Sequence, residues 1–306
     1  MKSDAKQHIL ILGVTGFIGS AFFNELKCNS KSIHFHILLR KEKVSLKESS
    51  NCSIYYGNLE TFNWSLLKAI PNFVYHFARI NSTKWRSVGR MMSAFKGRKA
   101  NKRLLNYLNE NAPSCTLYYL SGSLMYGNSD QVIVEGNKLN PISFARQYKT
   151  AENPFVKNQK LKKSIKTCMV RVPWVLGDGS WFKGFYKDYI LKNKHVPIYG
   201  EGDNMMSFIT LVELAEYLRL LMELDFHQTI HISYSQFISQ LEFAQLISKH
   251  RNLPLHQMGI DKHEKSINEA FTSNILLSSR IRELSVSQEE LDYKLNTQLT
   301  LIFKDV

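Results

Sequence analysis

The first forty residues combine a short apolar run, a glycine-rich loop and a helix-like segment. Residues 8–12 (HILIL) predict a buried strand, and residues 17–27 predict an amphipathic helix. Between them Gly13, Gly16 and Gly19 give the spacing G-x-x-G-x-x-G, and residues 33–39 predict a second strand. Such glycines allow a tight turn and let the backbone approach a pyrophosphate at a helix N-terminus. The pattern predicts a dinucleotide site, with a purely structural turn as the alternative interpretation.

Short apolar runs alternate with helical patterns along the first part of the chain, which is typical of βαβ units and a parallel sheet. We therefore predict an α/β, Rossmann-type, doubly wound parallel sheet with a smaller, partly helical C-terminal lobe. The expected strands are 8–12, 33–39, 53–56, 73–77, 116–120 and 167–172, and the expected helices lie near 17–27, 62–70, 91–110, 143–160, 182–193, 211–224, 239–250 and 287–303. Glycines and a proline in 196–203 indicate turns. Residues 1–175 are expected to bind the dinucleotide and residues 176–306 mainly the substrate, with the two parts interleaved.

Composition excludes several classes of protein. The 306 residues are 44% hydrophobic, but no apolar run approaches the length of a membrane span. The four cysteines, at positions 28, 52, 115 and 168, are widely separated and contain no Cys-x-x-Cys pair. They predict reduced thiols rather than a disulfide framework or a metal site, so we expect a cytoplasmic protein without a metal or a membrane partner.

The net charge of +14 is concentrated in one half of the chain. Residues 1–150 hold 21 lysines and arginines against 8 acidic residues, as expected of a part that handles phosphates. Residues 79–103 contain nine cations and no acidic residue. This stretch is typical of a solvated helix face, which in a homodimer would line the interface, and a polyanionic partner is the alternative. No nucleic-acid motif accompanies the stretch, so we expect no nucleic-acid partner.

Seven segments follow one another in an order that resembles the extended short-chain dehydrogenase/reductase family, also called the NAD-dependent epimerase/dehydratase family. They are the glycine loop, 57–59 (GNL), 74–79 (VYHFAR), Asn101, 119–127 (YLSGSLMYG), 171–177 (RVPWVLG) and 196–203 (VPIYGEGD). The resemblance implies a nicotinamide dinucleotide cofactor. The cofactor-contacting residues that it implies are Gly13, Thr15, Gly16, Phe17, Ile18, Gly19, Arg40, Asn58, Leu59, Phe77, Ala78, Arg79 and Pro173.

The end of the second expected strand decides between NAD and NADP. An acidic residue about 20 positions beyond the glycine loop would bind the ribose 2′-hydroxyl of NAD, whereas a cation there accommodates the 2′-phosphate of NADP. Arg40 holds this position, Lys41 and Lys43 add positive charge, and Glu42 is the only acidic residue nearby. We therefore predict NADP(H) in preference to NAD(H), with a solvated loop cation as the alternative interpretation.

The proton relay that is usual in this family has no counterpart here. Family enzymes resemble one another at a Ser or Thr, and at a Tyr and a Lys spaced Tyr-x-x-x-Lys. When Glu152 is aligned with the glutamate that often follows the lysine, the tyrosine and lysine positions hold Phe144 and Tyr148. The serine position holds Gly122. Tyr148, Ser121 and Ser123 remain as candidate catalytic residues, with Tyr148 as the proton donor.

The substrate side departs from the family pattern as well. Trp174 stands where the family often has Asn, and Met206 stands where nucleotide-sugar enzymes usually have Arg. Together with Phe144 and Trp181 they predict an apolar substrate pocket, with core packing as the alternative interpretation. The resulting hypothesis is an NADP(H)-dependent oxidoreductase that acts on a small, rather apolar carbonyl or imine. The alternatives are a non-catalytic NADP-binding sensor or scaffold, and a cyclase or lyase that keeps NADP as a structural element.

Overall fold

The computed structural model describes residues 6–29, 32–41, 46–80, 86–161, 164–224, 228–259, 269–281 and 284–304. The chain divides into two compact units that alternate along the sequence. Unit 1 comprises Met1–Leu120, Gln147–Val170 and Ala215–Thr229, and unit 2 comprises Ser121–Arg146, Arg171–Leu214 and Ile230–Val306. The division of labour between residues 1–175 and 176–306 concerns function and stays a prediction.

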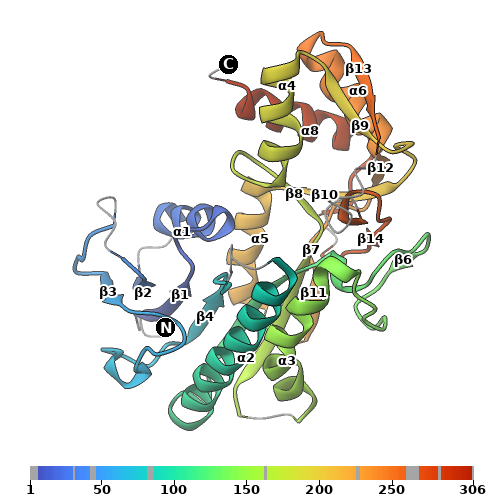
Figure 1. Ribbon diagram of the computed structural model, residues 1–306. Coiled ribbons are helices and arrows are strands. Elements are labelled where there is room, and N and C mark those ends of the chain that lie inside the picture. Colours follow the sequence, from blue (N-terminus) through green and yellow to red (C-terminus); the bar gives the residue numbers. More distant parts are fainter. Residues whose placement is uncertain are drawn as a thin grey trace. The chain divides into compact units, whose positions relative to one another are not determined.

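Helices and strands alternate throughout the chain (Figure 1). The α-helices are α1 (Phe17–Asn29), α2 (Arg86–Asn111), α3 (Arg146–Lys160), α4 (Asp188–Asn193), α5 (Leu211–Leu224), α6 (Gln240–Arg251) and α8 (Gln288–Ile302). Short helical turns are η1 (Trp64–Leu66), η2 (Ser123–Met125), η3 (Ser143–Ala145) and η4 (Lys183–Lys187). The strands are β1 (Gln7–Leu12), β2 (Ile33–Leu39), β3 (Cys52–Tyr56), β4 (Phe73–His76), β5 (Thr116–Gly122), β6 (Val132–Ile133), β7 (Lys166–Val172), β8 (Trp174–Leu176), β9 (Val196–Tyr199), β10 (Met205–Thr210), β11 (Thr229–His231), β12 (Phe237–Ser239), β13 (Leu255–Met258) and β14 (Leu276–Leu277).

A seven-stranded parallel sheet forms the centre of the fold, in the strand order β11-β7-β5-β4-β1-β2-β3. β1 pairs with both β2 and β4, so that Leu12 lies opposite Leu38 on one side and His76 on the other. The chain reverses its direction of travel across the sheet at β1, which places the carboxyl ends of β1 and β4 at a topological switch point. The predicted α/β class and its doubly wound parallel sheet are confirmed.

Both faces of the sheet in unit 1 are covered by helices. On one face Leu10 and Val74 pack with Leu104 and Leu108 of α2 and Phe155 of α3. On the other face Phe22 of α1 lies 4.2 Å from Tyr75 between ring centroids. The buried hydroxyls of Tyr75 and Tyr118 donate to the main-chain carbonyls of Leu218 and Leu221 in α5, at 2.7 and 2.6 Å. These bonds let large aromatic side chains fill the core without leaving an unpaired hydroxyl.

One sequence expectation is wrong, and another is incomplete. Residues 62–70 contain only the three-residue turn Trp64–Leu66, because Phe62 and Trp64 are buried while Leu66 and Ile70 are exposed, a pattern that gives no single apolar helix face. Residues 196–203 contain strand β9 in addition to turns, since Val196–Tyr199 pair in parallel with Leu255–Met258. That partner strand lies more than fifty residues later, so local turn signals could not reveal it.

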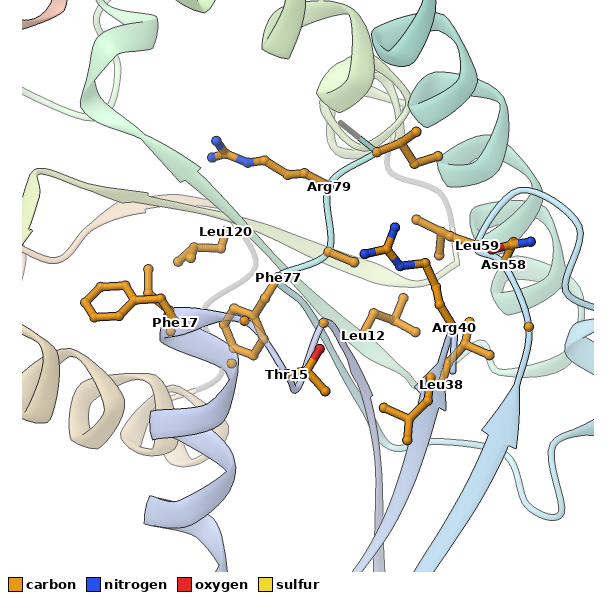
Figure 2. A pocket seen from close by; sticks show the side chains of 18 of the residues that line it. Leu12, Thr15, Phe17, Leu38, Arg40, Asn58, Leu59, Phe77, Arg79 and Leu120 are labelled. Carbon is orange, nitrogen blue, oxygen red and sulfur yellow. The ribbon is translucent and has the colours of Figure 1, made fainter. Parts of the chain in front are cut away.

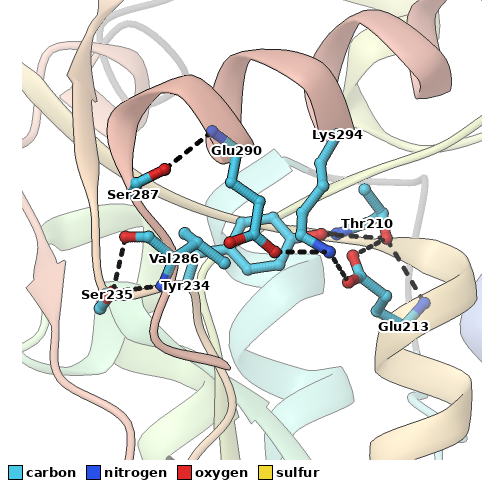
Figure 3. Close-up of polar contacts among 8 residues, drawn as sticks. All are labelled: Thr210, Glu213, Tyr234, Ser235, Val286, Ser287, Glu290 and Lys294. Carbon is cyan, nitrogen blue, oxygen red and sulfur yellow. Dashed lines mark hydrogen bonds and ion pairs between the residues drawn. The ribbon is translucent and has the colours of Figure 1, made fainter. Parts of the chain in front are cut away.

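A polar cluster holds α8 to the start of α5 within unit 2 (Figure 3). Lys294 of α8 contacts Glu213 at 2.6 Å and Glu290 at 3.5 Å. Burial lowers the pKa of Lys294, but the two carboxylates outweigh it and the net shift is upward. Thr210 caps α5: its hydroxyl donates to Glu213 at 2.7 Å and accepts from the Tyr234 hydroxyl at 3.2 Å. The cluster satisfies every charge that it partly buries.

Three imidazoles meet on one face of the sheet in unit 1. His8, His34 and His36 have ring centroids 4.9–5.4 Å apart. Nε2 of His36 lies 3.0 Å from Nδ1 of His8, and Nδ1 of His36 lies 3.0 Å from the Tyr55 hydroxyl. Among the residues that the structure describes, no group of histidine, cysteine and acidic side chains is arranged to hold a metal ion. Of the three, only His36 is buried, and it hydrogen-bonds with both His8 and Tyr55.

We expect acid to destabilise this fold through its buried histidines. Burial, followed by the neighbouring His34 and His8, lowers the pKa of His36 from 6.5 to about 4. Burial alone dominates at His76, whose pKa is also about 4. The unfolded chain therefore binds more protons than the folded chain between pH 6.5 and 4, so this stability is fully present above pH 6.5 and is lost as the pH falls towards 4. Urea unfolding at a series of pH values should show a decrease of a few kcal/mol across this range.

A histidine variant separates this effect from general acid denaturation. His36→Asn should lower stability at neutral pH but reduce the loss between pH 6.5 and 4. His256→Asn changes an exposed histidine of unit 2 and should keep the full loss. An unchanged pH profile in His36→Asn would contradict the assignment.

Candidate functional site

The glycine loop joins β1 to α1 in a turn that needs glycine at two positions. Gly13 has φ +88°, and a Cβ there would lie 2.7 Å from the main-chain nitrogen of Ala78. A Cβ on Gly19 would lie 2.2 Å from the carbonyl oxygen of Gly13. At Gly16 the nearest atom would be 3.2 Å away, so this position is tight but not closed. The turn brings the first N–H groups of α1 to the carboxyl end of β1, where an anion can be bound.

A pocket of about 580 Å³ opens beside this loop within unit 1 (Figure 2). Twelve of the thirteen cofactor residues expected from the sequence line it: Gly13, Thr15, Gly16, Phe17, Ile18, Gly19, Arg40, Asn58, Leu59, Phe77, Ala78 and Arg79. Pro173 belongs to unit 2 and is not among the described lining residues, so its role stays a prediction. Sequence reasoning missed Leu12, Leu38, Leu39, Gly57, Glu60, Ile80 and Leu120, although their positions beside the recognised segments could have indicated them.

The charge of the pocket lining is positive. Arg40, which directly follows β2, and Arg79, three residues beyond β4, are exposed and line the pocket (Figure 2). No carboxylate among the described residues pairs with either guanidinium. Glu60 is the one acidic residue of the described lining, and its carboxylate lies 3.9 Å from the ammonium group of Lys96. Glu42 and Lys43, which flank the arginine in the sequence, lie outside the described residues. An anionic ligand therefore meets little opposing charge here.

Tyr148, the candidate proton donor, lies beside the pocket wall. The guanidinium carbon of Arg79 lies 4.5 Å from the centroid of the Tyr148 ring, a cation–π arrangement. Tyr148 is half-buried in the first turn of α3, within the same unit as the pocket. The tyrosine is thus held next to a lining residue of the candidate cofactor site.

Buried hydrogen bonds fix the position of α3 within unit 1. Nε2 of His76 lies 2.9 Å from Oδ1 of Asn101, whose Nδ2 donates to the carbonyl of Ala151 at 2.8 Å. Asn101 is one of the seven segments that resemble the family, and it links β4 and α2 to α3. Tyr148 lies one helical turn before Ala151, so this network also fixes the position of the Tyr148 side chain along α3.

The two candidate serines lie in unit 2, and both are buried. Ser121 is 3% exposed and accepts a hydrogen bond from the guanidinium of Arg171, which is itself buried. Ser123 is also buried, at the start of η2. Gly122, between them, has space for a side chain, since the nearest atom to an added Cβ would be 3.9 Å away. The glycine is therefore not required by packing.

Two of the expected substrate residues, Trp174 and Trp181, belong to one aromatic group with Phe271. Trp174 and Trp181 lie together at 4.8 Å between centroids, and Phe271 lies 5.3 Å from Trp174. Phe144 is half-buried on η3, whereas Met206 is completely buried in β10, opposite Ile238 of β12. Met206 offers a ligand no surface in this structure and contributes core packing, the alternative stated above. The two tryptophans keep their place as candidates.

Comparison with known families settles the membership of this chain. The profile described as the NAD dependent epimerase/dehydratase family matches residues 9–232, well over half of the sequence. The chain belongs to this family. None of the curated proteins compared with the chain matches it.

Solved structures share the fold of this family member along nearly its whole length. A UDP-N-acetylglucosamine 4-epimerase from Methanobrevibacter ruminantium M1 in complex with UDP-N-acetylmuramic acid has 17% identity and a TM-score of 0.79, covering 99% of this chain and 100% of its own. A dTDP-glucose 4,6-dehydratase from Bacillus anthracis in complex with NAD has 14% identity and a TM-score of 0.74, covering 98% and 97%. A UDP-glucuronic acid 4-epimerase from Bacillus cereus in complex with UDP-glucuronic acid and NAD has 18% identity and a TM-score of 0.74, covering 97% and 99%.

Among the described residues, no helix is long and apolar enough to cross a bilayer.

Proposed function

We propose that this family member binds NADP(H) in the pocket of unit 1 and prefers it to NAD(H). The observation that carries the proposal is Arg40, a guanidinium that lines the pocket at the end of β2 without a carboxylate partner among the described residues. A cation at this strand end matches a 2′-phosphate, whereas a 2′-hydroxyl calls for an acidic residue. Solved relatives that contain NAD support the nicotinamide class of cofactor.

The glycine loop fits the pyrophosphate of such a cofactor. Side chains at Gly13 and Gly19 would collide with backbone atoms. The pocket is therefore lined at these two positions by backbone without side chains, which a pyrophosphate could approach closely. The N–H groups at the start of α1 then supply donors and the positive end of the helix dipole. Asn58 and Leu59 line the same pocket beyond β3 and would contact the base.

We further propose that the protein is an oxidoreductase for a small, rather apolar carbonyl or imine. The cofactor, when bound, supplies or accepts the hydride. Tyr148 would give a proton to the substrate oxygen, and Ser121 or Ser123 would orient the reacting group. An iminium substrate is already cationic and would need no proton from tyrosine. Trp174 and Trp181 would provide the apolar wall.

A second candidate function rests on the residues at the triad positions. Gly122 and Phe144 have no proton to exchange, and Ser121 already accepts a hydrogen bond from Arg171. A non-catalytic NADP-binding sensor or scaffold, or a cyclase or lyase with NADP as a structural element, would tolerate this arrangement. NADPH consumption with a panel of aldehydes, ketones and cyclic imines separates the oxidoreductase from these alternatives.

Arg40→Ala tests the cofactor proposal. Charge-assisted hydrogen bonds are worth about 1.5–3 kcal/mol each, so the variant should bind NADPH about 10- to 150-fold more weakly. NADH binding should change little, because NADH lacks the 2′-phosphate. Titration calorimetry with both cofactors provides the measurement. Arg98→Ala, which removes an exposed arginine of α2 that does not line the pocket, serves as the matched control. Equal NADPH and NADH affinities in the parent protein would refute the preference.

A further inference from the structure

Two guanidinium groups line the pocket of unit 1, and they come from opposite sides of the strand that leads into the glycine loop. Arg40 follows β2 and Arg79 follows β4, and the strand order β5-β4-β1-β2-β3 places these strands on either side of β1. Leu120 of β5 lines the pocket on the Arg79 side, and Asn58, which lies beyond β3, lines it on the Arg40 side. In Figure 2 the Arg79 side chain extends to the side of the pocket that holds Leu120, away from Arg40.

The two sides of the pocket correspond to the two halves of a dinucleotide. A dinucleotide at a topological switch point spans both sides, with its pyrophosphate at the glycine loop and the helix N-terminus. The adenosine half lies beside the end of the second strand, where Arg40 stands, and in NADP(H) it carries the 2′-phosphate. The nicotinamide half therefore falls on the β4 side, beside Arg79. The anionic group of this half is its own phosphate within the pyrophosphate, so position and charge match Arg79 to that phosphate.

The guanidinium of Arg79 is available to such a phosphate. The side chain is exposed, and among the described residues no carboxylate or other acceptor is hydrogen-bonded to it. Its guanidinium carbon lies 4.5 Å from the centroid of the Tyr148 ring. A cation over an aromatic face keeps its charge, and the N–H groups of a guanidinium match the oxygens of a phosphate in pairs. A phosphate that arrives here displaces no ion pair.

A buried frame holds Arg79 and Tyr148 in register before any ligand binds. His76 lies three residues before Arg79, and its Nε2 is 2.9 Å from Oδ1 of Asn101. Nδ2 of Asn101 donates at 2.8 Å to the carbonyl of Ala151, three residues after Tyr148. Both His76 and Asn101 are buried. Because one asparagine fixes the backbone on both sides of the pair, less conformational entropy is lost when Arg79 binds an anion.

We propose that Arg79, held against the Tyr148 ring, binds the nicotinamide-side phosphate of the cofactor's pyrophosphate. The inference rests on the proposed function for the class of cofactor, but not on the preference for NADP(H), because NAD(H) carries the same pyrophosphate. Arg79 is then a binding residue, and Tyr148 is a positioning residue that acts on it through the aromatic ring. This role of the ring is separate from any proton that the Tyr148 hydroxyl gives. The pair fastens the cofactor to the helix that carries the candidate proton donor.

A carboxylate of the substrate is the competing partner for Arg79. The pyrophosphate has the stronger claim, since it carries two negative charges and lies at the adjoining glycine loop. The proposed substrate, by contrast, is an uncharged or cationic group in apolar surroundings. The test therefore uses cofactor fragments alone, with no substrate present.

Cofactor fragments separate the roles of the two arginines. ADP-ribose contains the pyrophosphate but no 2′-phosphate, whereas adenosine 2′,5′-bisphosphate contains the 2′-phosphate but no nicotinamide-side phosphate. In titration calorimetry with the full chain, Arg79→Gln should weaken the binding of ADP-ribose, NADH and NADPH by a similar factor, about 10- to 150-fold. Its affinity for adenosine 2′,5′-bisphosphate should not change. Arg40→Ala should give the reverse pattern, with weaker binding of the bisphosphate and NADPH but not of ADP-ribose.

Variants of Tyr148 test the positioning role of its ring. Tyr148→Phe keeps the ring and should keep the parent's affinity for ADP-ribose. Tyr148→Leu removes the ring and should weaken ADP-ribose binding about two- to five-fold, the usual contribution of an exposed cation–π contact. This loss should disappear when Arg79→Gln is also present, because the ring then has no guanidinium to hold. A merely structural role of the ring would give the same loss in both backgrounds.

Lys27→Gln provides the matched control. Lys27 is an exposed cation of unit 1 whose ammonium nitrogen lies 5.5 Å from the centroid of the Phe23 ring, and it is not among the described lining residues of the pocket. The variant removes one positive charge and one cation–π contact, as Arg79→Gln does. All four affinities should therefore remain at the parent's values. Thermal unfolding of each variant measures whether the fold is retained.

Three results would overturn the inference. The first is an unchanged affinity for ADP-ribose in the folded Arg79→Gln protein. The second is equal weakening of ADP-ribose and adenosine 2′,5′-bisphosphate, which would indicate a general effect of charge. The third is weakening confined to NADPH and the bisphosphate, which would place Arg79 at the 2′-phosphate. Equal affinities of the parent for NADPH and NADH would refute only the cofactor preference, and the ADP-ribose series would still decide the role of Arg79. A parent that binds none of the four ligands would refute both.

Discussion

Gly16→Val should reduce NADPH affinity more than 100-fold while the chain remains folded. A valine side chain at this position enters the space between the loop and the pyrophosphate, and it separates the phosphate from the N–H groups that start α1. Losing two charge-assisted hydrogen bonds of about 1.5–3 kcal/mol each accounts for a loss of this size. The added Cβ would meet only the Gly13 carbonyl oxygen, at 3.2 Å, which a small shift of the loop relieves. Titration calorimetry measures the affinity, and circular dichroism together with thermal unfolding measures the fold.

Two further glycine variants define what the result means. Gly136→Val places the same side chain at a position with no atom within 4 Å, so it should leave both affinity and stability unchanged. Gly19→Val should disturb the loop itself, because its Cβ would lie 2.2 Å from the Gly13 carbonyl oxygen. Normal NADPH affinity in a folded Gly16→Val protein would show that the loop is only a turn.

The fold of unit 1 and its candidate cofactor pocket could be predicted from the sequence, because the patterns that indicate them lie within short, continuous stretches of the chain. The apolar run before Gly13, the loop and the following helix are contiguous, and parallel strands buried on both faces give unbroken apolar segments such as 9–12. Arg40 could be assigned to the pocket because a strand end lies at a fixed place relative to a switch point. Twelve residues that were expected to contact the cofactor line one pocket, because the segments that hold them follow strands whose carboxyl ends meet at the same edge of the sheet.

The structure of unit 2 is harder to predict from the sequence, because its strands are short and their partners are far away along the chain. β10 lies between β8 and β12, and β9 pairs with β13. Strands of three to six residues carry too little periodicity to be recognised without their partners. Met206 illustrates the consequence: the sequence left both a pocket position and core packing open, and only the structure shows its side chain buried in β10, where it pairs with Ile238 and Ile275. Likewise, the bond between Arg171 and Ser121 joins residues fifty positions apart.

Tyr148→Phe should lower turnover by about 10²–10⁴-fold if Tyr148 is the proton donor of a carbonyl reductase, the usual contribution of a positioned general acid. NADPH binding should remain, since the ring that stacks on Arg79 is kept and only the hydroxyl is lost. The measurement is NADPH oxidation with the panel of aldehydes, ketones and cyclic imines. Unchanged turnover of a carbonyl substrate would exclude Tyr148, whereas unchanged turnover confined to imines would indicate a reaction that needs no tyrosine proton.

Restoring the family's residues provides the complementary result. Gly122 has space for a serine side chain, but Tyr148→Lys would place an ammonium group beside the Arg79 guanidinium, which now lies 4.5 Å from the ring centroid. Like charges at this range repel, and the cation–π contact is lost with the ring. We therefore expect Phe144→Tyr/Tyr148→Lys to show carbonyl reduction equal to or lower than the parent, because the surroundings are built for a tyrosine. New carbonyl reduction in this variant, with none in the parent, would instead identify a decayed enzyme whose site still accepts the usual relay.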